Sequence, residues 1–282
     1  MKVSHEMPLA LLRDGTEVKV NDYFYALVHL FDNSPEYYQY TVNQLKSGRE
    51  VILDNSAYEL HGKPFDTEKF VEWIKKLCED SGANNNLTYI IPDEFDEMDA
   101  TYERAAKFLE AFNPPGRAMD VCQGKNIFEL AKIFDQYTKL RGVWRIGINF
   151  MSKAYTTFME IATGPGDPWM HRAQGRKYFL EHLYHTGKLQ TRNIHLLGAS
   201  LPNEFRYYTI EHPKLSDFIC SLDTSAPVIQ GMFSNDLYDI GNQLAHSKLP
   251  QKLAEHLNDN ISEPQRLRII YNAEVFRIYN GV

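Results

Sequence analysis

Short apolar runs alternate with longer amphipathic segments along most of this 282-residue chain. The runs are apolar on both faces, which is typical of strands in a parallel sheet whose two sides are both covered. Most of them end abruptly in a polar or turn-forming residue. The pattern predicts eight strands: Met1–Met7, Phe24–Phe31, Val51–Leu53, Leu87–Ile91, Ala118–Cys122, Val143–Ile148, Ile194–Leu197 and Phe218–Leu222.

The segments between these runs have the spacing of helices. Asp66–Cys78 is an example, because its apolar residues Phe70, Ile74 and Leu77 fall on one helical face. Ser34 is a predicted cap at the start of another helix. The predicted helices are Glu36–Lys46, Asp66–Cys78, Met98–Phe112, Asn126–Leu140, Arg176–Thr186, Asn203–His212, Leu249–Leu257 and Pro264–Tyr279.

The alternation of strands and helices predicts an α/β fold, a (β/α)8 TIM barrel formed by residues 1–282 as a single domain. Residues 229–282 are predicted to be a helical C-terminal extension. A doubly wound sheet of seven strands is the alternative if Met1–Met7 is not a strand. No compositional break marks a second domain, and the polar stretch Ala162–Trp169 is predicted to be an insertion before a helix.

The composition is that of a globular protein with a substantial core, because 43% of the residues are hydrophobic and 24% are charged. No apolar run reaches the roughly 18 residues of a membrane span. The N-terminus lacks the apolar segment and cleavage site of a signal peptide. Three widely spaced cysteines form no Cys-x-x-Cys pattern, which indicates neither a zinc site nor a disulfide framework. These features favour a reduced, cytoplasmic protein.

The net charge and the sequence motifs limit which cofactors and partners we expect. The net charge of −7 and the pI near 5.8 do not by themselves indicate nucleic-acid binding, but they allow a local basic face. The best candidates for phosphate contacts are Arg172, Arg176 and Lys177, with solvated helix faces as the alternative. The phosphate-binding patterns GxGxxG and GxxxxGK(S/T) follow none of the strands, and HExxH and HxH are absent. We therefore expect no cofactor and no metal.

The ends of the strands are predicted to face one pocket, where barrel enzymes hold their catalytic groups. Gly147 interrupts an apolar strand, and such a glycine often marks the close approach of a ligand to the backbone. Gly198 allows the same interpretation. Carboxylates, an amide and glycine-opened backbone suit a flat, polar ligand that is rich in hydrogen-bond donors. The predicted site residues are Asp54, Asp93, Gln123, Gly147, Gly198 and Asp223.

Each polar candidate also has a purely structural interpretation. Asp223 would cap the next helix, and Asp54 would form a local Asx turn. Asp93 would lie in a solvated acidic loop, and Gln123 would belong to a plain turn. The recurrence of the pattern at successive strand ends favours function, because an ionised carboxylate at the mouth of a buried strand is costly unless it is hydrogen-bonded.

Six short motifs stand at these strand ends in the order LDNSAYE, PDE, DVCQG, IG, LGAS and LDTSAP. In type and order they resemble the tRNA-guanine transglycosylase superfamily, over roughly Val51 to Pro227. Within it, the chain is most similar to the phage and bacterial branch that places 7-deazaguanines in DNA. The chain has Asn-Ser-Ala-Tyr after Asp54 where the family has Ser-Gly-Gly-Phe, and it lacks the family's Cys-x-Cys-x-x-Cys…His zinc site. The missing zinc site favours DNA over tRNA as the polymer.

The resemblance implies a base-exchange reaction and a role for most of the site residues. Asp223 would be the nucleophile that attacks C1′ of a guanosine, so that guanine leaves and a covalent glycosyl ester forms. Asp54 would handle protons on the leaving and incoming bases. Asp93 and Gln123 would hydrogen-bond the base, and the backbone amide of Gly147 would face its carbonyl. The implied partners are a nucleic acid whose target base is outside the duplex and a free 7-deazaguanine.

Other interpretations remain open at this point. Tyr58, Phe95 and Phe150 are candidates for stacking on the base, with core packing as the alternative. A barrel hydrolase would cleave an N-glycosidic bond with the same Asp223 and Asp54, and water would replace the incoming base. A non-catalytic barrel would only bind a nucleic acid or a protein, and Asp223→Ala would then leave its function intact. The sequence leaves the choice of tRNA or DNA, the 7-deazaguanine and the oligomeric state open.

Overall fold

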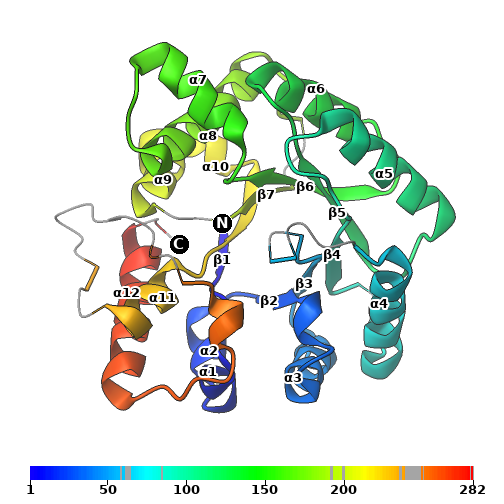
Figure 1. Cartoon of the computed structure of the whole chain (residues 1–282), viewed down its shortest axis with the longest axis vertical. Coiled ribbons are helices and arrows are strands. Elements are labelled where there is room, and N and C mark those ends of the chain that lie inside the picture. Colours follow the sequence, from blue (N-terminus) through cyan, green and yellow to red (C-terminus); the bar gives the residue numbers. More distant parts are fainter. Residues whose placement is uncertain are drawn as a thin grey trace.

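The computed structural model describes residues 1–57, 59–60, 65–83, 85–190, 193–198, 201–234, 237–238, 249, 251–279 and 281. Eight parallel strands form one nearly closed barrel, and the helices lie outside it (Figure 1). The predicted (β/α)8 barrel is therefore confirmed. Its strands are β1 (Lys2–Ser4), β2 (Phe24–Leu27), β3 (Val51–Asp54), β4 (Leu87–Ile90), β5 (Arg117–Cys122), β6 (Val143–Asn149), β7 (Ile194–Leu197) and β8 (Ile219–Asp223).

Helices follow the strands along the described part of the chain. The α-helices are α1 (Leu9–Arg13), α2 (Thr16–Val20), α3 (Pro35–Lys46), α4 (Thr67–Ser81), α5 (Met98–Ala111), α6 (Ile127–Tyr137), α7 (Lys153–Thr163), α8 (Pro168–His185), α9 (Pro202–Arg206), α10 (Pro213–Ser216), α11 (Ala226–Phe233) and α12 (Glu263–Tyr279). Single turns of other helix types are η1 (Val28–Leu30), η2 (Tyr207–Glu211) and η3 (Leu253–His256). The predicted cap at Ser34 is present, since its hydroxyl accepts a hydrogen bond from the Tyr37 amide at 3.2 Å.

Some predicted elements are longer than the observed ones, among them Met1–Met7, which contains only the three-residue strand β1. The apolar run Phe24–Phe31 contains only the four-residue strand β2, and the chain then turns through η1 with Val28 and Leu30 still buried. The hydrophobic pattern of the sequence does not reveal this change of conformation, because a buried turn and a buried strand are equally apolar. The helix predicted at Leu249–Leu257 is, in its described residues, the single turn η3.

The predicted insertion at Ala162–Trp169 is also corrected. It is a tight connection between two helices, α7 and α8, and the prediction missed α7 entirely. Helix α8 begins at Pro168, well before the predicted start at Arg176, because Asp167 accepts hydrogen bonds from the next amides and Pro168 occupies the first turn. Three short helices, α1, α2 and α10, were missed as well.

The two ends of the sheet, β1 and β2, lie next to each other without a strand ladder among the described residues. Asp22, which precedes β2, bridges the seam. Its amide donates to the Val3 carbonyl at 2.9 Å, and its carboxylate accepts from the Val3 amide at 2.8 Å and pairs with Arg277 of α12 at 3.0 Å. Tyr23 donates to the carbonyl of Leu222 in β8 at 2.5 Å. These contacts hold the start of β2 against β1 and β8 and close the barrel.

The described residues of the predicted helical extension, 229–282, contain the end of α11, the turn η3 and the long helix α12, joined by non-helical segments. Helix α12 packs on α11, and Gly231 makes this close approach possible. A Cβ atom at this position would lie 2.5 Å from Cγ1 of Ile269. At the carboxyl ends of the strands, the sheet register pairs Leu27 with Asp54 and Ser4 with Asp223. Both carboxylates therefore end their strands at the edge where barrel enzymes hold their sites.

Candidate active site

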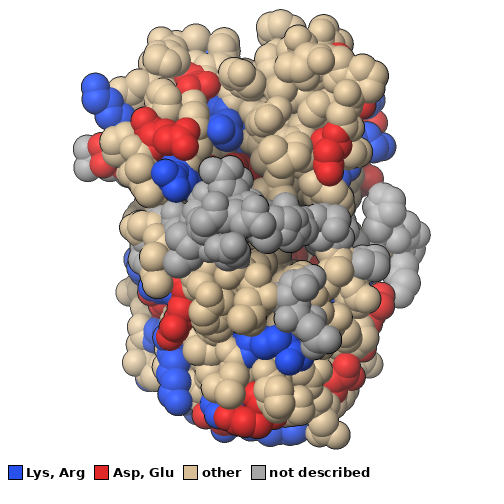
Figure 2. Space-filling view, turned by 90° about the vertical axis from the view of Figure 1, so that its left-hand side faces the viewer, with Lys and Arg blue, Asp and Glu red and all other residues tan. Residues whose placement is uncertain are grey.

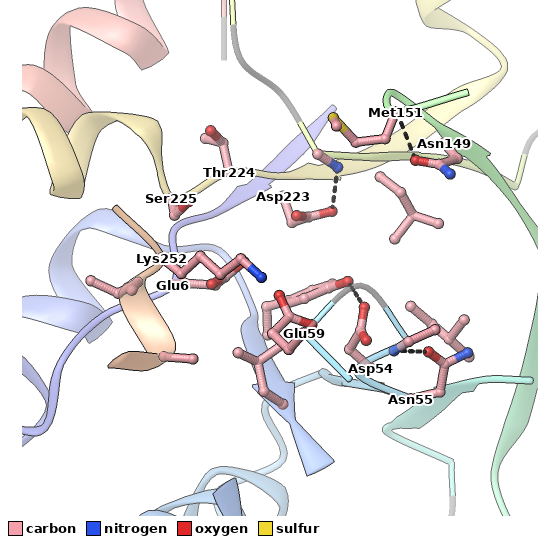
Figure 3. Close-up of a pocket in the computed structure, with 18 of the residues that line it drawn as sticks. Glu6, Asp54, Asn55, Glu59, Asn149, Met151, Asp223, Thr224, Ser225 and Lys252 are labelled. Carbon is pink, nitrogen blue, oxygen red and sulfur yellow. Dashed lines mark hydrogen bonds between the residues drawn. The ribbon is translucent and has the colours of Figure 1, made fainter. Parts of the chain in front are cut away.

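A cavity of about 320 Å³ opens at the carboxyl ends of the strands (Figure 3). Its walls are partly apolar, with Leu27, Val121 and Leu197 among them. Five described carboxylate residues and a single lysine line it, so the cavity is strongly acidic. These residues are Glu6, Asp54, Glu59, Asp93, Asp223 and Lys252.

Asp223 is the last residue of β8 and is 4% exposed. One of its carboxylate oxygens, Oδ1, accepts hydrogen bonds from Nε2 of His195 at 3.0 Å and from the amide of Gly198 at 3.1 Å. It does not cap the following helix, because the hydroxyl of Thr224 accepts from the Ala226 amide instead. The structural interpretation of Asp223 as a helix cap is therefore wrong.

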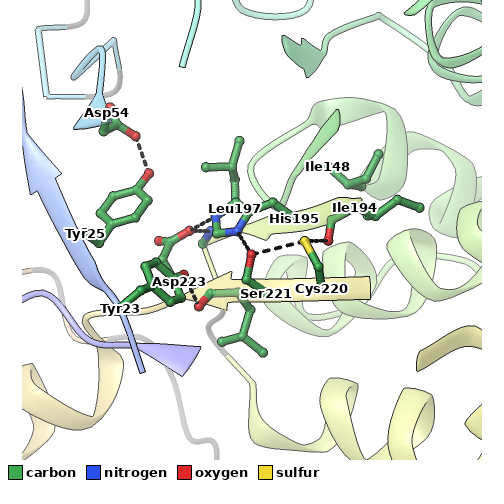
Figure 4. A network of polar contacts seen from close by, with 12 residues as sticks. Tyr23, Tyr25, Asp54, Ile148, Ile194, His195, Leu197, Cys220, Ser221 and Asp223 are labelled. Atoms are coloured by element: carbon green, nitrogen blue, oxygen red, sulfur yellow. Dashed lines mark hydrogen bonds and ion pairs between the residues drawn. The ribbon is translucent and has the colours of Figure 1, made fainter. Parts of the chain in front are cut away.

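His195 lies behind Asp223 and is fully buried (Figure 4). The register of the sheet pairs it with Ser221, whose Oγ is 2.8 Å from Nδ1. The imidazole ring stacks on the Tyr25 ring, with centroids 6.1 Å apart and an interplanar angle of 11°. Burial lowers the pKa of His195, and the neighbouring Asp223 opposes this effect. His195 was not among the predicted site residues, since a histidine within an apolar run has no distinguishing pattern.

Asp54 approaches the same cavity from β3. Its Oδ2 accepts from the Tyr25 hydroxyl, and its Oδ1 accepts from the amide of Ser56. The bond to Ser56 is the predicted Asx turn, so the structural interpretation is correct even though the side chain also lines the cavity. Burial and the charge of Glu59 raise the pKa of Asp54 from 3.8 to about 8, with Asp223 adding to this effect.

Tyr25 connects Asp54 with Asp223 through His195. Its hydroxyl donates to Asp54, and its ring covers His195, which in turn donates to Asp223 (Figure 4). The side chain is buried and also lines the cavity. Tyr25 was not among the predicted site residues, because within a buried strand it is indistinguishable from a core aromatic.

Asp93 follows β4 and lines the cavity as predicted. Its carboxylate accepts from the side-chain amide of Asn55 at 3.0 Å and from that of Gln123 at 2.6 Å. Burial raises the pKa of Asp93, and these two hydrogen bonds oppose the rise. The neighbouring Glu94 forms an exposed ion pair with Arg104. The interpretation of the whole PDE motif as a solvated loop therefore fails at Asp93.

Gln123 does not have the predicted role of contacting a base. It is fully buried, its Nε2 donates to Asp93, and its Oε1 accepts from the amide of Asp96 at 3.3 Å. Both ends of the side-chain amide are therefore occupied, and Gln123 is absent from the described cavity lining. Its role is to hold Asp93.

The prediction for Gly147 is wrong for a related reason. This glycine lies within β6, paired in register with Val121 and His195, and a Cβ atom there would lie 2.7 Å from Cδ1 of Leu197. The missing side chain makes room for Leu197 and leaves no open backbone for a ligand. Gly198 does line the cavity, and with φ +67° it adopts the left-handed conformation that favours glycine.

Asn149, the last residue of β6, lines the cavity and was also missed. Its Oδ1 accepts from the amide of Met151 at 2.8 Å (Figure 3). This contact orients the side-chain amide and commits its oxygen. The donor end, Nδ2, is thus the group that Asn149 offers to a ligand.

Arg176 is not the surface phosphate ligand that the sequence predicted. Its guanidinium is fully buried and pairs with Glu204 at 2.6 Å. It also donates to the carbonyl oxygens of Ile148, Leu197 and Gly198 at 3.0–3.1 Å. Arg176 therefore ties together the ends of β6 and β7, and through Gly198 it supports Asp223.

Arg172 and Lys177, the other predicted phosphate ligands, lie on aromatic rings. The guanidinium of Arg172 is 4.9 Å from the Trp169 ring centroid, and Nζ of Lys177 is 3.8 Å from that of Tyr207. Basic and acidic residues are interspersed among the described residues on the face in Figure 2. A phosphate-binding role for Arg172 and Lys177 stays a prediction.

The three aromatic candidates for stacking on the base have different outcomes. Phe150 is 1% exposed and stacks on Trp169 at 6.0 Å and 7°, so its role is packing. Phe95 lines the cavity. Tyr58 lies outside the described residues. The described residues contain no group of three or more His, Cys, Asp and Glu placed to hold a metal, and none of the described helices could span a membrane.

No family model matches the chain, and no curated protein matches it. Solved structures with a similar chain path include one titled as catalytic site mutants of active domain 2 of chitinase from Pyrococcus furiosus. It has a TM-score of 0.48 and 12% identity, and the match covers 97% of this chain and 95% of that one. Another is CdNal from Clostridium difficile in complex with mannosamine, with a TM-score of 0.45, 12% identity and coverage of 96% and 91%. Both TM-scores are below 0.5, and neither likeness bears on the function of this chain.

Proposed function

We propose that this protein is a base-exchange transglycosylase, which replaces a guanine in DNA by a free 7-deazaguanine through a covalent ester on Asp223. The observation that carries the proposal is a pair of carboxyl groups with different surroundings in one cavity. Asp223 accepts two N–H donors at one oxygen, whereas the pKa of Asp54 is raised to about 8. Retaining glycosyl transfer uses such a pair, with one carboxylate as nucleophile and one as an acid that later becomes a base.

In the first half of the reaction, the Asp223 carboxylate attacks C1′ of the target nucleotide. The bond between C1′ and N9 breaks, and its electron pair leaves with the guanine. Asp54, protonated at neutral pH because burial raises its pKa, gives a proton to the leaving base. The products are a glycosyl ester on Asp223, neutral guanine and the Asp54 carboxylate.

In the second half, a 7-deazaguanine occupies the position that guanine has left. Asp54, now a carboxylate, takes the proton from the nitrogen that attacks C1′. The ester bond breaks, and its electron pair returns to Asp223. The stereochemistry at C1′ is retained because two inversions occur, and both carboxyl groups return to their starting protonation states.

The base would be recognised by both a hydrogen-bond acceptor and a hydrogen-bond donor. The Asp93 carboxylate, held by Asn55 and Gln123, would accept from the N–H groups of a guanine-like ring. Asn149 would donate from Nδ2 to the ring carbonyl, since Met151 occupies its oxygen. Asn149 thus takes the position in the proposal that the resemblance gave to Gln123 and Gly147.

The size of the cavity supports a single flipped nucleotide as the bound group. About 320 Å³ is at the lower end of small-molecule pockets, which hold roughly 300–1,000 Å³. A duplex does not fit, so the target base must leave its stack at a cost of a few kcal/mol. The preference for DNA rests on the resemblance, because the chain lacks the zinc-site cysteines of the tRNA enzymes.

The decisive experiment is base exchange with the purified full chain. Radiolabelled guanine is offered with DNA and with tRNA in separate reactions, for wild type, Asp223→Asn and the control Asp217→Asn. Asp217 is exposed and lies six positions before Asp223, so the control makes the same charge change outside the cavity. We expect label in DNA for wild type and Asp217→Asn, and none for Asp223→Asn.

Other outcomes would reject the proposal or change its substrate. Label in tRNA alone would keep the transglycosylase and replace its polymer. Release of free base from either polymer without incorporation would favour the hydrolase. If neither polymer takes up label or loses base, with a 7-deazaguanine also offered as the incoming base, the transglycosylase proposal is wrong.

A further inference from the structure

The tautomer of His195 follows from its two polar contacts. A carboxylate only accepts hydrogen bonds, so Nε2, at 3.0 Å from Asp223, carries the hydrogen. The buried ring is neutral, and Nδ1 therefore accepts the hydroxyl hydrogen of Ser221 at 2.8 Å. Ser221 and the stacked Tyr25 ring thus hold the imidazole in one tautomer and one orientation.

The two oxygens of Asp223 have different surroundings. His195 and the amide of Gly198 both donate to Oδ1. No donor among the described residues makes a hydrogen bond to Oδ2. Two donors that converge on one oxygen fix the plane of the carboxylate, and they leave the other oxygen available for bond formation.

We propose that His195 is the positioning residue of the nucleophile, holding Oδ1 of Asp223 so that Oδ2 attacks C1′ and stabilising the carboxylate when the ester breaks. This inference rests on the proposed base exchange, because it concerns one step of that reaction. His195 acts through Asp223 and makes no contact with the substrate.

The bond changes at Asp223 explain why this hydrogen bond matters. When Oδ2 bonds to C1′, the carboxylate becomes a neutral ester and Oδ1 becomes its carbonyl oxygen. When the incoming nitrogen attacks C1′, the bond from Oδ2 breaks and its electron pair restores the carboxylate. Hydrogen bonds to an ionised oxygen are stronger than those to a neutral carbonyl. The donor on His195 therefore favours the carboxylate over the ester.

Loss of this donor would consequently stabilise the covalent intermediate relative to free enzyme. The second half of the exchange, in which the ester breaks, would slow. A hydrogen bond to a charged group corresponds to a change of about 10- to 100-fold in rate or equilibrium. Affinity for the bases would stay the same, because His195 is absent from the described lining of the cavity.

The test compares His195→Gln with His195→Leu. The Gln side chain places a donor near the position of Nε2, whereas Leu is of similar size and has none. Covalent enzyme–DNA adduct is formed without an incoming base and trapped by denaturation, and its decay is followed after guanine is added. We expect decay about 10- to 100-fold slower in His195→Leu, decay near the wild-type rate in His195→Gln, and an unchanged KM for guanine in both.

A third variant, Ser221→Ala, keeps the imidazole but removes the donor to Nδ1. It should slow adduct decay by less than His195→Leu. If His195→Leu does not fold, adduct decay in Ser221→Ala tests the role of His195 instead. Wild-type decay in His195→Leu, or in Ser221→Ala when Leu is unfolded, would overturn the role of His195. Equal slowing in His195→Gln and His195→Leu would also overturn it, by showing a packing effect. Failure of the wild type to exchange bases or form adduct would instead reject the proposed function itself.

Discussion

Asp223 and Asp54, two of the acidic residues that line the cavity, are the same residue type in different surroundings. Asp223 lies against two N–H donors that meet at a single oxygen. Asp54 accepts from Tyr25 and Ser56, but it is half-buried near Glu59, and its pKa rises to about 8. The difference shows how neighbouring groups separate a nucleophile from an acid when both are aspartates.

The supporting structures differ as well. Behind Asp223, His195 and Gly198 are held by Ser221 and by the buried guanidinium of Arg176. Asp54 is held by a local turn and by Tyr25 from the neighbouring strand β2. The Asp223 side is therefore built from several strands, and the Asp54 side mostly from its own loop. Substitutions near Asp223 and substitutions near Asp54 should therefore affect different measured quantities.

The largest effect that separates the two sides is expected from Asp54→Asn. General acid catalysis contributes about 10²- to 10⁴-fold, so guanine release should slow by that factor while Asp223 remains intact. The protonated form of Asp54 is required, and its fraction falls as the pH rises through about 8. Wild-type guanine release should therefore decrease above that pH. Single-turnover release as a function of pH measures both effects.

The same pH series provides the control for this prediction. Asp217→Asn should keep the wild-type rate and the decrease above pH 8. Asp54→Asn should lose the decrease together with its rate, because an amide does not titrate. A variant that still slows above the same pH would assign the acid to another group.

A smaller effect, confined to the Asp223 side, is expected from Arg176→Met. Breaking a buried ion pair by removing one partner costs about 3–5 kcal/mol of unfolding free energy, since Glu204 is left buried without its cation. Lys177→Met is the matched control and should cost less than about 1 kcal/mol, the size of a cation–π contact near the surface. Urea denaturation measures both. Equal losses would contradict the structural role of Arg176.

The smallest effect, on base binding only, is expected from Asn149→Asp. The new carboxylate can still accept from the Met151 amide, but it repels the ring carbonyl that Nδ2 would contact. The KM for the incoming base should rise roughly 10- to 100-fold, with little change in the rate at saturating base. The control is Asn113→Asp, at an exposed position. An unchanged KM would remove Asn149 from base recognition and leave the comparison of the two aspartates intact.

Much of the fold was predictable because the signals for it are local. Apolar runs, caps and turn residues specify elements over a few positions, and all eight strands lie where the pattern predicts them. The predictions of individual elements failed where the local pattern was ambiguous. The polar stretch at 162–169 resembles an insertion, but it contains the end of one helix and the start of the next.

The candidate site was predicted in part. Asp54, Asp93, Gly198 and Asp223 line the cavity, because the carboxyl ends of parallel strands meet at one edge. Gln123 and Gly147 were in the right region but had the wrong roles. A side chain's partner cannot be inferred from its own position when that partner comes from a neighbouring strand.

The sequence by itself thus determined which residues end the strands, since this depends on the chain's own hydrophobic pattern. Only the closed barrel decided which buried side chains point inward and meet. His195 opposes Ser221 through the register of β7 and β8, and Tyr25 reaches Asp54 from the adjacent strand β2. Strands that are buried on both faces give no alternation from which the inward face can be inferred. For that reason the carboxylates could be predicted from the sequence, whereas the groups that distinguish them could not.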